Sequence, residues 1–183
     1  MRPYEALMLP GLGNSGPAHW QSVWQARDAG ITRLRQREWD APVRDEWVRT
    51  LDDALAERSV PVVLAGHSTG AILVAHWLSQ VAPAQVAKVA GALIVAPSDP
   101  LGPNYPAGPT GFDPVPRVAM PFRAIVVASD RDPYAALDWS RRHAQAWGAE
   151  CVVLPDAGHI NADSGHGAWS EGYALLDTLR IRR

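Results

Sequence analysis

Six short apolar runs alternate with helix-forming stretches along the chain, and this alternation limits its possible folds more than any other feature. Apolar strands that are separated by helices are typical of a parallel sheet covered on both faces. We therefore expect an α/β fold with about six mostly parallel strands. The predicted strands are Tyr4–Leu9, Ile31–Glu38, Val60–Ala65, Val89–Ala96, Phe122–Ser129 and Glu150–Leu154, and the predicted helices are Pro17–Ala29, Arg44–Arg58, Ala71–Val81, Pro133–Trp147 and Ala168–Leu179.

Length and charge limit the class of protein. A chain of 183 residues fits a single domain, 1–183, and its 47% apolar and 20% charged residues are normal for a globular protein. The net charge is −2, Lys88 is the only lysine, and the arginines are scattered. This composition predicts neither a nucleic-acid partner nor a membrane partner, and it points to no particular protein partner. Without a secretory pattern or a long apolar segment, we expect a cytoplasmic protein.

A single cysteine, Cys151, excludes an internal disulfide framework and a cysteine-based metal cluster. It lies in an apolar run that predicts a buried strand, so we expect an inert core thiol. The histidines lack the paired spacing of a two-histidine metal site on one helix. We expect neither a metal nor a cofactor.

The segment 62–70 predicts a nucleophile elbow. An apolar strand breaks into Gly66-x-Ser68-x-Gly70, and a helix-forming sequence follows. In such a turn the serine stands exposed at the end of the sheet, and the two glycines avoid collisions with neighbouring backbone. His67, inside the motif, is expected to pack beneath the turn.

An acid and a base follow two later strands, in the order expected of an α/β-hydrolase triad. A serine hydroxyl needs a base within hydrogen-bonding distance and a group that orients the base. Asp132 follows the fifth strand and His159 the sixth, so both can meet Ser68 at one sheet edge. Asp130 competes with Asp132 for the orienting role, but it lies nearer the strand end and suits bonds to loop amides. His166 reads as a loop histidine.

The loop after the first strand is expected to complete an oxyanion hole. The Thr69 amide, at the start of the elbow helix, is one donor, and Leu12 is the expected second donor, with Gly13 or Asn14 as alternatives. Gly13, Asn14, His19 and Trp20 are expected to contact substrate, although Trp20 with Trp24 also suits a helix face packed on the core.

The same loop has an alternative interpretation. Residues 11–16 match the G-x-G-x-x-G pattern, and Glu38 follows about twenty residues later, as in a dinucleotide-binding protein. Pro17 suggests that the helix begins after Gly16, whereas the last glycine of that pattern should lie within the helix. This alternative also leaves the predicted triad unexplained.

The proline-rich segment 97–121 shows little periodicity. A long structureless loop in a compact domain is usually functional or mobile. The segment is either a stiff surface connection or a wall of the pocket that we expect at the carboxyl ends of the strands. No insertion is long enough for a separate lid domain.

The chain resembles the small serine hydrolase family that includes retinoblastoma-binding protein 9 and the bacterial YdeN-like proteins. The resemblance rests on blocks spread along the sequence: Leu9–Ser15 with His19, Trp20 and Trp24, then Gly66–Gly70, Ser129–Pro133, and Gly158–Asn161 with Gly165–Gly167. It implies a compact α/β-hydrolase fold without a lid, the triad named above, and carboxylesterase-type or peptidase-type activity. Retinoblastoma binding is not implied.

The sequence thus predicts a cofactor-free serine hydrolase that acts on a small ester, or less readily on an amide or thioester. Ser68 would be the nucleophile, His159 the base and Asp132 the orienting acid. The alternative from another class is a non-catalytic protein-binding module on a hydrolase scaffold, because a fold alone does not determine function.

Overall fold

The structure is a computed structural model that describes residues 3–181; of the predicted domain 1–183, residues 1–2 and 182–183 lie outside this range. Within it, no helix combines the length and apolar character needed to cross a membrane. The strands are β1 (Glu5–Leu9), β2 (Ile31–Arg33), β3 (Val62–His67), β4 (Val89–Val95), β5 (Arg123–Ser129) and β6 (Glu150–Leu154). The helices are α1 (Trp20–Arg27), α2 (Arg44–Ala56), α3 (Thr69–Leu78), α4 (Pro83–Val86), α5 (Leu137–Trp147) and α6 (Ser170–Arg180).

The strands form one sheet in the order β2-β1-β3-β4-β5-β6, and every pair is parallel. This confirms the predicted α/β fold, with a sheet that is wholly rather than mostly parallel. The change of direction in strand order lies between β1 and β3. Ligands of open parallel sheets bind outside the carboxyl ends of the strands.

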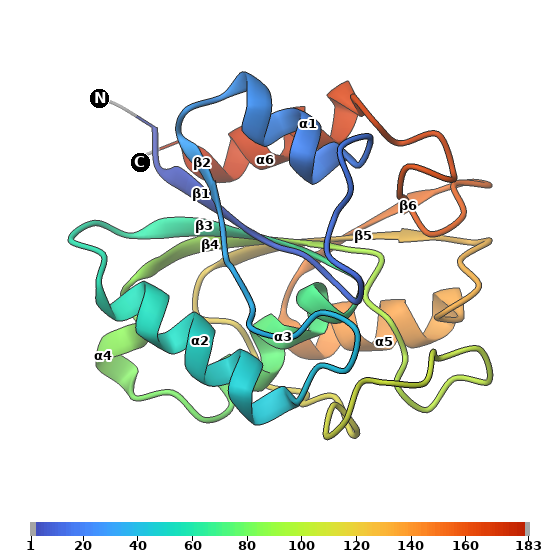
Figure 1. Ribbon diagram of the computed structural model, residues 1–183, viewed down its shortest axis with the longest axis horizontal. Helices are drawn as coiled ribbons and strands as arrows, with labels where there is room; N and C mark the ends of the chain where they lie inside the picture. Colours follow the sequence, from blue (N-terminus) through green and yellow to red (C-terminus); the bar gives the residue numbers. More distant parts are fainter. Residues whose placement is uncertain (1–2, 182–183) are drawn as a thin grey trace.

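Helices cover both faces of the sheet, as the apolar runs predicted (Figure 1). Helices α1 and α6 lie on one face, and α2, α3, α4 and α5 lie on the other. Alternation along β1 supplies both layers: Leu7 and Leu9 join the cluster beneath α2 and α3, and Ala6 and Met8 join the cluster beneath α1 and α6. All ten residues of α3 are buried, which explains its mostly apolar sequence; Thr69 and His76 are the polar exceptions.

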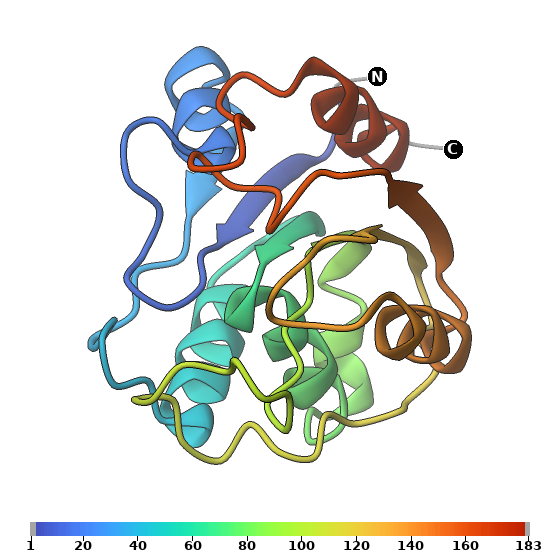
Figure 2. The same cartoon turned by 90° about the vertical axis from the view of Figure 1, so that its right-hand side faces the viewer.

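Figure 2 views the molecule from the side toward which the strands run. The loops that follow β1, β4, β5 and β6 all lie on this side. The segment 97–121 is tied to the fold at several points: Thr110 bridges to Val43 beside α2, and the Met120 amide donates to the Trp147 carbonyl at 2.9 Å. The segment 97–121 is therefore fixed to the rest of the fold along its length.

Element ends differ from the sequence prediction. The β2 strand stops at Arg33 instead of Glu38, and it forms one edge of the sheet. Helix α1 begins at Trp20 instead of Pro17, because the His19 side chain accepts the Gln21 amide and caps the helix there. The four-residue α4 has no counterpart in the sequence prediction.

The expectation for Cys151 is wrong, since its side chain is exposed. The physical reason is that β6 forms the other sheet edge, where one side has no neighbouring strand and the cover is thin. Partial burial still raises the pKa of the Cys151 thiol above its ordinary value. A raised pKa lowers the thiolate fraction, so the thiol is a weak nucleophile despite its exposure.

Candidate active site

Ser68 occupies a strained turn between β3 and α3. Its backbone has φ 57° and ψ −124°, a combination that non-glycine residues rarely adopt. The flanking glycines are required by contact: a Cβ at Gly66 would lie 2.5 Å from the Gly70 carbonyl oxygen, and one at Gly70 would lie 2.1 Å from the Leu9 carbonyl oxygen. The turn thus packs directly against the end of β1 and presents Ser68 at the carboxyl ends of the strands.

The predicted acid, Asp132, and the predicted base, His159, are hydrogen-bonded to each other. The His159 Nδ1–H donates to both carboxylate oxygens of Asp132, at 2.9 and 3.0 Å. The same carboxylate accepts the Tyr134 amide at 2.9 Å, which fixes its orientation. The side chains of Asp132 and His159 are 4% and 9% exposed, so little water screens this pair. With Nδ1 protonated, the neutral imidazole carries its free lone pair on Nε2.

Ser68 and His159 line one cavity of about 220 Å³ at the carboxyl ends of the strands. Its walls come from four loops as well as the elbow. The lining residues are Leu12, Asn14, His19, His67, Ser68, Ser98, Pro106, Tyr134, His159 and Asn161.

The Ser68 hydroxyl is bonded to another serine. Its Oγ lies 2.9 Å from the Ser98 Oγ. Among residues 3–181, no hydrogen bond joins Ser68 Oγ to the His159 ring. The three predicted residues therefore share one site, with the Asp132–His159 bond formed and the Ser68–His159 bond not formed in the structure.

Asp130 contacts the loop backbone, as expected from its place near the strand end. Its Oδ1 accepts the Asp156 amide at 2.7 Å. The neighbouring Ser129 hydroxyl accepts the amides of Arg131 and Ala157, each at 3.1 Å. These bonds join the loop that carries Asp132 to the loop that carries His159.

The loop after β1 lies directly against Ser68. A Cβ at Gly11 would lie 2.8 Å from the Ser68 Cβ, so glycine is needed for this approach. The Gly13 amide donates to the Trp39 carbonyl and the Asn14 amide to the Gly11 carbonyl, whereas within the described chain the Leu12 amide has no such bond. Of the three residues considered for the second oxyanion donor, Leu12 is thus the one whose amide remains available, and it lines the cavity.

The first donor, the Thr69 amide, belongs to the first residue of α3. An amide at this position has no carbonyl partner within its own helix, and the positive end of the helix dipole adds to its attraction for an anion. Both expected donors are therefore compatible with an oxyanion beside Ser68.

Two buried, neutral histidines, His67 and His19, lie near His159, the predicted base. His67 donates its Nε2–H to the His159 carbonyl at 2.9 Å, and burial lowers the His67 pKa well below its ordinary value. Burial is also the main cause that lowers the pKa of His19 to about 4, with the charge of Arg33 second. The His19 and His67 rings meet edge to face at 4.6 Å. His67 thus packs beneath the turn, in the position expected from the sequence.

The residues expected to contact substrate divide into two groups. Asn14 and His19 line the cavity, whereas Gly13 and Trp20 are not among the lining residues. For Trp20 this is a correction: its side chain is fully buried, and its indole N–H donates to the Ile160 carbonyl at 3.0 Å. It anchors the loop that carries His159. None of the residues lining this cavity is a tryptophan, and His166 is not among them.

The dinucleotide alternative loses its structural basis. Gly16 lies before α1, which begins at Trp20, so the pattern's last glycine is outside the helix. The Glu38 carboxylate accepts the Asp40 amide at 2.8 Å within its own loop. Among the described residues, no group of three or more histidine, cysteine, aspartate or glutamate side chains is arranged to hold a metal ion.

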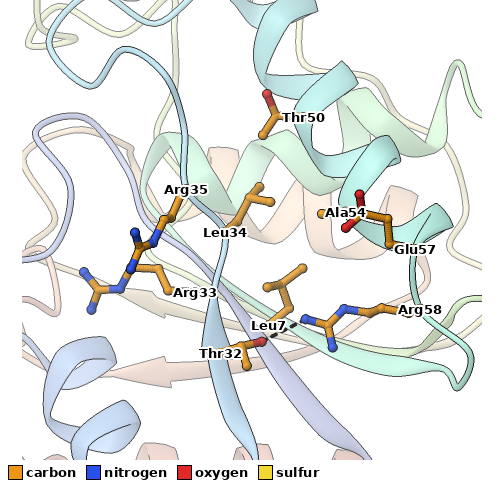
Figure 3. A pocket seen from close by; sticks show the side chains of 9 residues that line it. All are labelled: Leu7, Thr32, Arg33, Leu34, Arg35, Thr50, Ala54, Glu57 and Arg58. Atoms are coloured by element: carbon orange, nitrogen blue, oxygen red, sulfur yellow. Dashed lines mark hydrogen bonds between the residues drawn. The ribbon is translucent and has the colours of Figure 1, made fainter.

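A larger hollow of about 450 Å³ lies beside the sheet edge, between β2 and α2 (Figure 3). Arg33, Arg35 and Arg58 line it with Thr32 and Leu34. Its residues include no pairing of a nucleophile with a histidine, and Arg58 is held by a 2.8 Å bond to the Thr32 hydroxyl. The hollow near Ser68 is smaller, but it contains the groups that can do chemistry.

Four residues of the cavity were not singled out from the sequence: Ser98, Pro106, Tyr134 and Asn161. Ser98 is the third residue after β4, and Asn161 follows the predicted base by two positions. A search for every polar residue just beyond a strand end would have found Ser98. Pro106 comes from the proline-rich segment, which therefore does form part of the pocket wall.

Known proteins resemble this chain in sequence and in fold. Residues 6–178 match the family model described as serine hydrolase. A protein described as a YdeN-like hydrolase, from Pectobacterium atrosepticum, is 32% identical over 97% of this chain and 91% of its own, with a TM-score of 0.84. The ydeN gene product of B. subtilis is 17% identical, over 96% and 98% of the two chains, with a TM-score of 0.71.

A monoacylglycerol lipase of Paleococcus ferrophilus shares the fold at 12% identity, with a TM-score of 0.71 over 95% of this chain and 93% of the lipase. No curated protein matches the sequence. The family match covers nearly the entire chain, and it confirms the resemblance drawn from the sequence blocks. The protein is a hydrolase of the α/β-hydrolase fold and belongs to the serine hydrolase family.

Proposed function

We propose that the protein hydrolyses small carboxylic esters through an acyl-enzyme on Ser68. The observation that carries this proposal is the shared cavity, in which Ser68 and the Asp132-bound His159 are lining residues. The membership of the chain in a serine hydrolase family supports it. Two solved structures of the same fold are an esterase from Thermogutta terrifontis and the monoacylglycerol lipase, and both of these names refer to ester cleavage.

In the proposed mechanism, Ser68 first turns its hydroxyl toward His159 Nε2. The imidazole takes the proton as Ser68 Oγ attacks the carbonyl carbon, and the carbonyl oxygen becomes an oxyanion held by the Leu12 and Thr69 amides. The imidazolium then gives the proton to the leaving alcohol. Asp132 holds Nδ1–H and stabilises the imidazolium. Water then attacks the acyl carbon as His159 takes its proton. The bond to Ser68 Oγ breaks, the acid leaves, and the imidazolium returns the proton to Ser68 Oγ.

A fluorophosphonate, which modifies activated serines covalently, tests the proposal. We expect one adduct per chain, located at Ser68 by mass spectrometry, and no adduct with Ser68→Ala. We also expect p-nitrophenyl acetate hydrolysis to fall to the background rate in that variant. Removing the nucleophile eliminates the acyl-enzyme route but alters no core contact, since Ser68 lies at the carboxyl ends of the strands and its side chain bonds only Ser98 among the described residues.

The control is a check that the wild-type protein and Ser68→Ala are equally well folded. Both proteins should give the same circular dichroism spectrum and melting temperature within a few degrees. Folded wild-type protein that takes no label and cleaves no ester would contradict the proposal, and it would favour a binding module on a hydrolase scaffold.

A further inference from the structure

Ser98 lies closest to the nucleophile among the groups without an assigned role. It follows β4, is 2% exposed, and lines the cavity. Its Oγ lies 2.9 Å from Ser68 Oγ, and within residues 3–181 this is its only side-chain hydrogen bond. The hydroxyl groups of Ser68 and Ser98 are thus hydrogen-bonded to each other, while His159 is hydrogen-bonded to Asp132.

This bond opposes the first step of catalysis. A serine hydroxyl has one proton, and attack requires that proton to point at His159 Nε2. If Ser68 donates to Ser98, its proton points away from the base. If Ser68 accepts from Ser98, the bond engages a lone pair of the oxygen that must attack. In both arrangements the contact stabilises the free enzyme more than the transition state for acylation.

Release also leaves a buried group without a partner. When Ser68 turns toward His159, the Ser98 hydroxyl loses its only side-chain partner in the described structure. A buried hydroxyl without a hydrogen bond is destabilising unless a bound molecule replaces the partner. A substrate oxygen in the cavity could do so, because Ser98 lines the same cavity as Ser68.

We propose that Ser98 is a positioning residue that holds the Ser68 hydroxyl away from His159 while the cavity is empty. This inference depends on the proposed function of Ser68 as nucleophile. It assigns Ser98 no contact with the reacting carbonyl. Its effect is on the fraction of molecules in which Ser68 is oriented for attack.

The test compares the rate of fluorophosphonate labelling in Ser98→Ala and in wild-type protein. Loss of one hydrogen bond of ordinary strength should raise the second-order labelling rate by about 2- to 10-fold. The value of kcat/KM for p-nitrophenyl acetate should rise in parallel. A merely structural role predicts the opposite sign, because a disturbed cavity reacts more slowly.

Ser129→Ala is the matched control. Ser129 ends the neighbouring strand β5, is 1% exposed, and bonds loop amides instead of Ser68. It loses a buried hydroxyl as Ser98→Ala does, but it frees no nucleophile. Because the Ser129 hydroxyl joins the loops that carry Asp132 and His159, we expect the labelling rate of this variant to fall and not to rise. An unchanged or lower rate in folded Ser98→Ala would overturn the proposal.

A crystal structure of the free wild-type protein gives an independent test that requires no variant. We expect Ser68 Oγ within hydrogen-bonding distance of Ser98 Oγ and no bond from it to His159 Nε2. The reverse arrangement would overturn the positioning role, even if Ser98→Ala did not fold. Wild-type labelling that Ser68→Ala abolishes tests the nucleophile separately, so failure of one proposal is distinguishable from failure of the other.

Discussion

At the residue scale, the Asp132 carboxylate has the most demanding task. It accepts the His159 ring N–H through both oxygens and the Tyr134 amide through one. These bonds fix which imidazole nitrogen carries the proton, and so which one would accept a proton in the proposed mechanism. Burial keeps the pair from exchanging its partners for water.

We predict that Asp132→Asn keeps the fold and lowers kcat for p-nitrophenyl acetate by about 10³- to 10⁴-fold, as expected when a triad loses its acid. An amide of the same shape can still accept the Tyr134 amide. It can also donate to Nδ1, and this favours the tautomer with the proton on Nε2. Steady-state kinetics with a melting curve measures both effects.

Asp130→Asn is the control for that variant. Its carboxylate bonds the Asp156 amide and not the His159 ring, so we expect a loss of less than about tenfold in kcat, well below that for a triad residue. Equal losses in the two variants would mean that the loop contacts matter as much as the acid.

Sequence patterns could indicate Ser68, Asp132 and His159 as candidates because each of them belongs to a recognisable motif at a strand end, and the structure brings these candidates to one site. Ser98 has no such motif, since a serine after a strand is usually a turn residue. For Trp20 the sequence left two alternatives, a substrate contact or packing on the core, and the structure shows the second. Helical spacing says which side chains share a face, but it does not say whether that face meets a cavity or the core.

At the scale of elements, the site is formed by several loops at the carboxyl ends of the strands. The loops after β1, β4, β5 and β6 each contribute to the cavity near Ser68. The proximity of these loops was predictable, because the carboxyl ends of parallel strands lie on the same side of the sheet. Helix ends were less predictable: α1 starts where a histidine caps it, and histidine is not a usual capping residue.

The size of the cavity sets an expectation for substrates. At about 220 Å³ it is smaller than most pockets for drug-sized ligands, which measure roughly 300–1,000 Å³. We predict that p-nitrophenyl acetate or butyrate gives the highest kcat/KM in a series that extends to decanoate, with a fall of at least about tenfold by octanoate because longer chains lose burial in the cavity. Rising values with chain length would contradict this prediction.

At the scale of the whole molecule, stability should depend on pH through buried histidines. His76 on α3 is 1% exposed and donates Nε2–H to the Phe112 carbonyl at 2.9 Å, while its Nδ1 is buried and has no hydrogen-bond partner among the described residues. Burial lowers the pKa of His76 to about 4. Protonation would therefore bury a charge and an unpartnered N–H in the folded state.

The sign follows from proton uptake on unfolding. Because the folded pKa lies below the unfolded value of 6.5, the unfolded chain binds more protons between these two values. The stability from neutral His76 is complete above about pH 6.5 and is lost as the pH falls toward 4. We predict that His76 alone lowers the free energy of unfolding by on the order of 2 kcal/mol between pH 7 and pH 5.

Urea titrations at several pH values measure this loss. His76→Gln offers a similar donor without a titrating ring, and His76 is not among the residues that line the active-site cavity. We expect this variant to show a flatter dependence of stability on pH, by about the amount assigned to His76, with esterase activity retained. The same pH dependence in both proteins would contradict the assignment.

The loop that carries His159 is restrained from inside the molecule at two successive carbonyl groups. His67 holds the carbonyl of His159 itself, and Trp20 holds that of Ile160. An imidazole mounted on such a support has little freedom to follow an arriving ester. We therefore expect the adjustment on substrate binding to come from the Ser68 side chain, whose hydroxyl rotates about the Cα–Cβ bond.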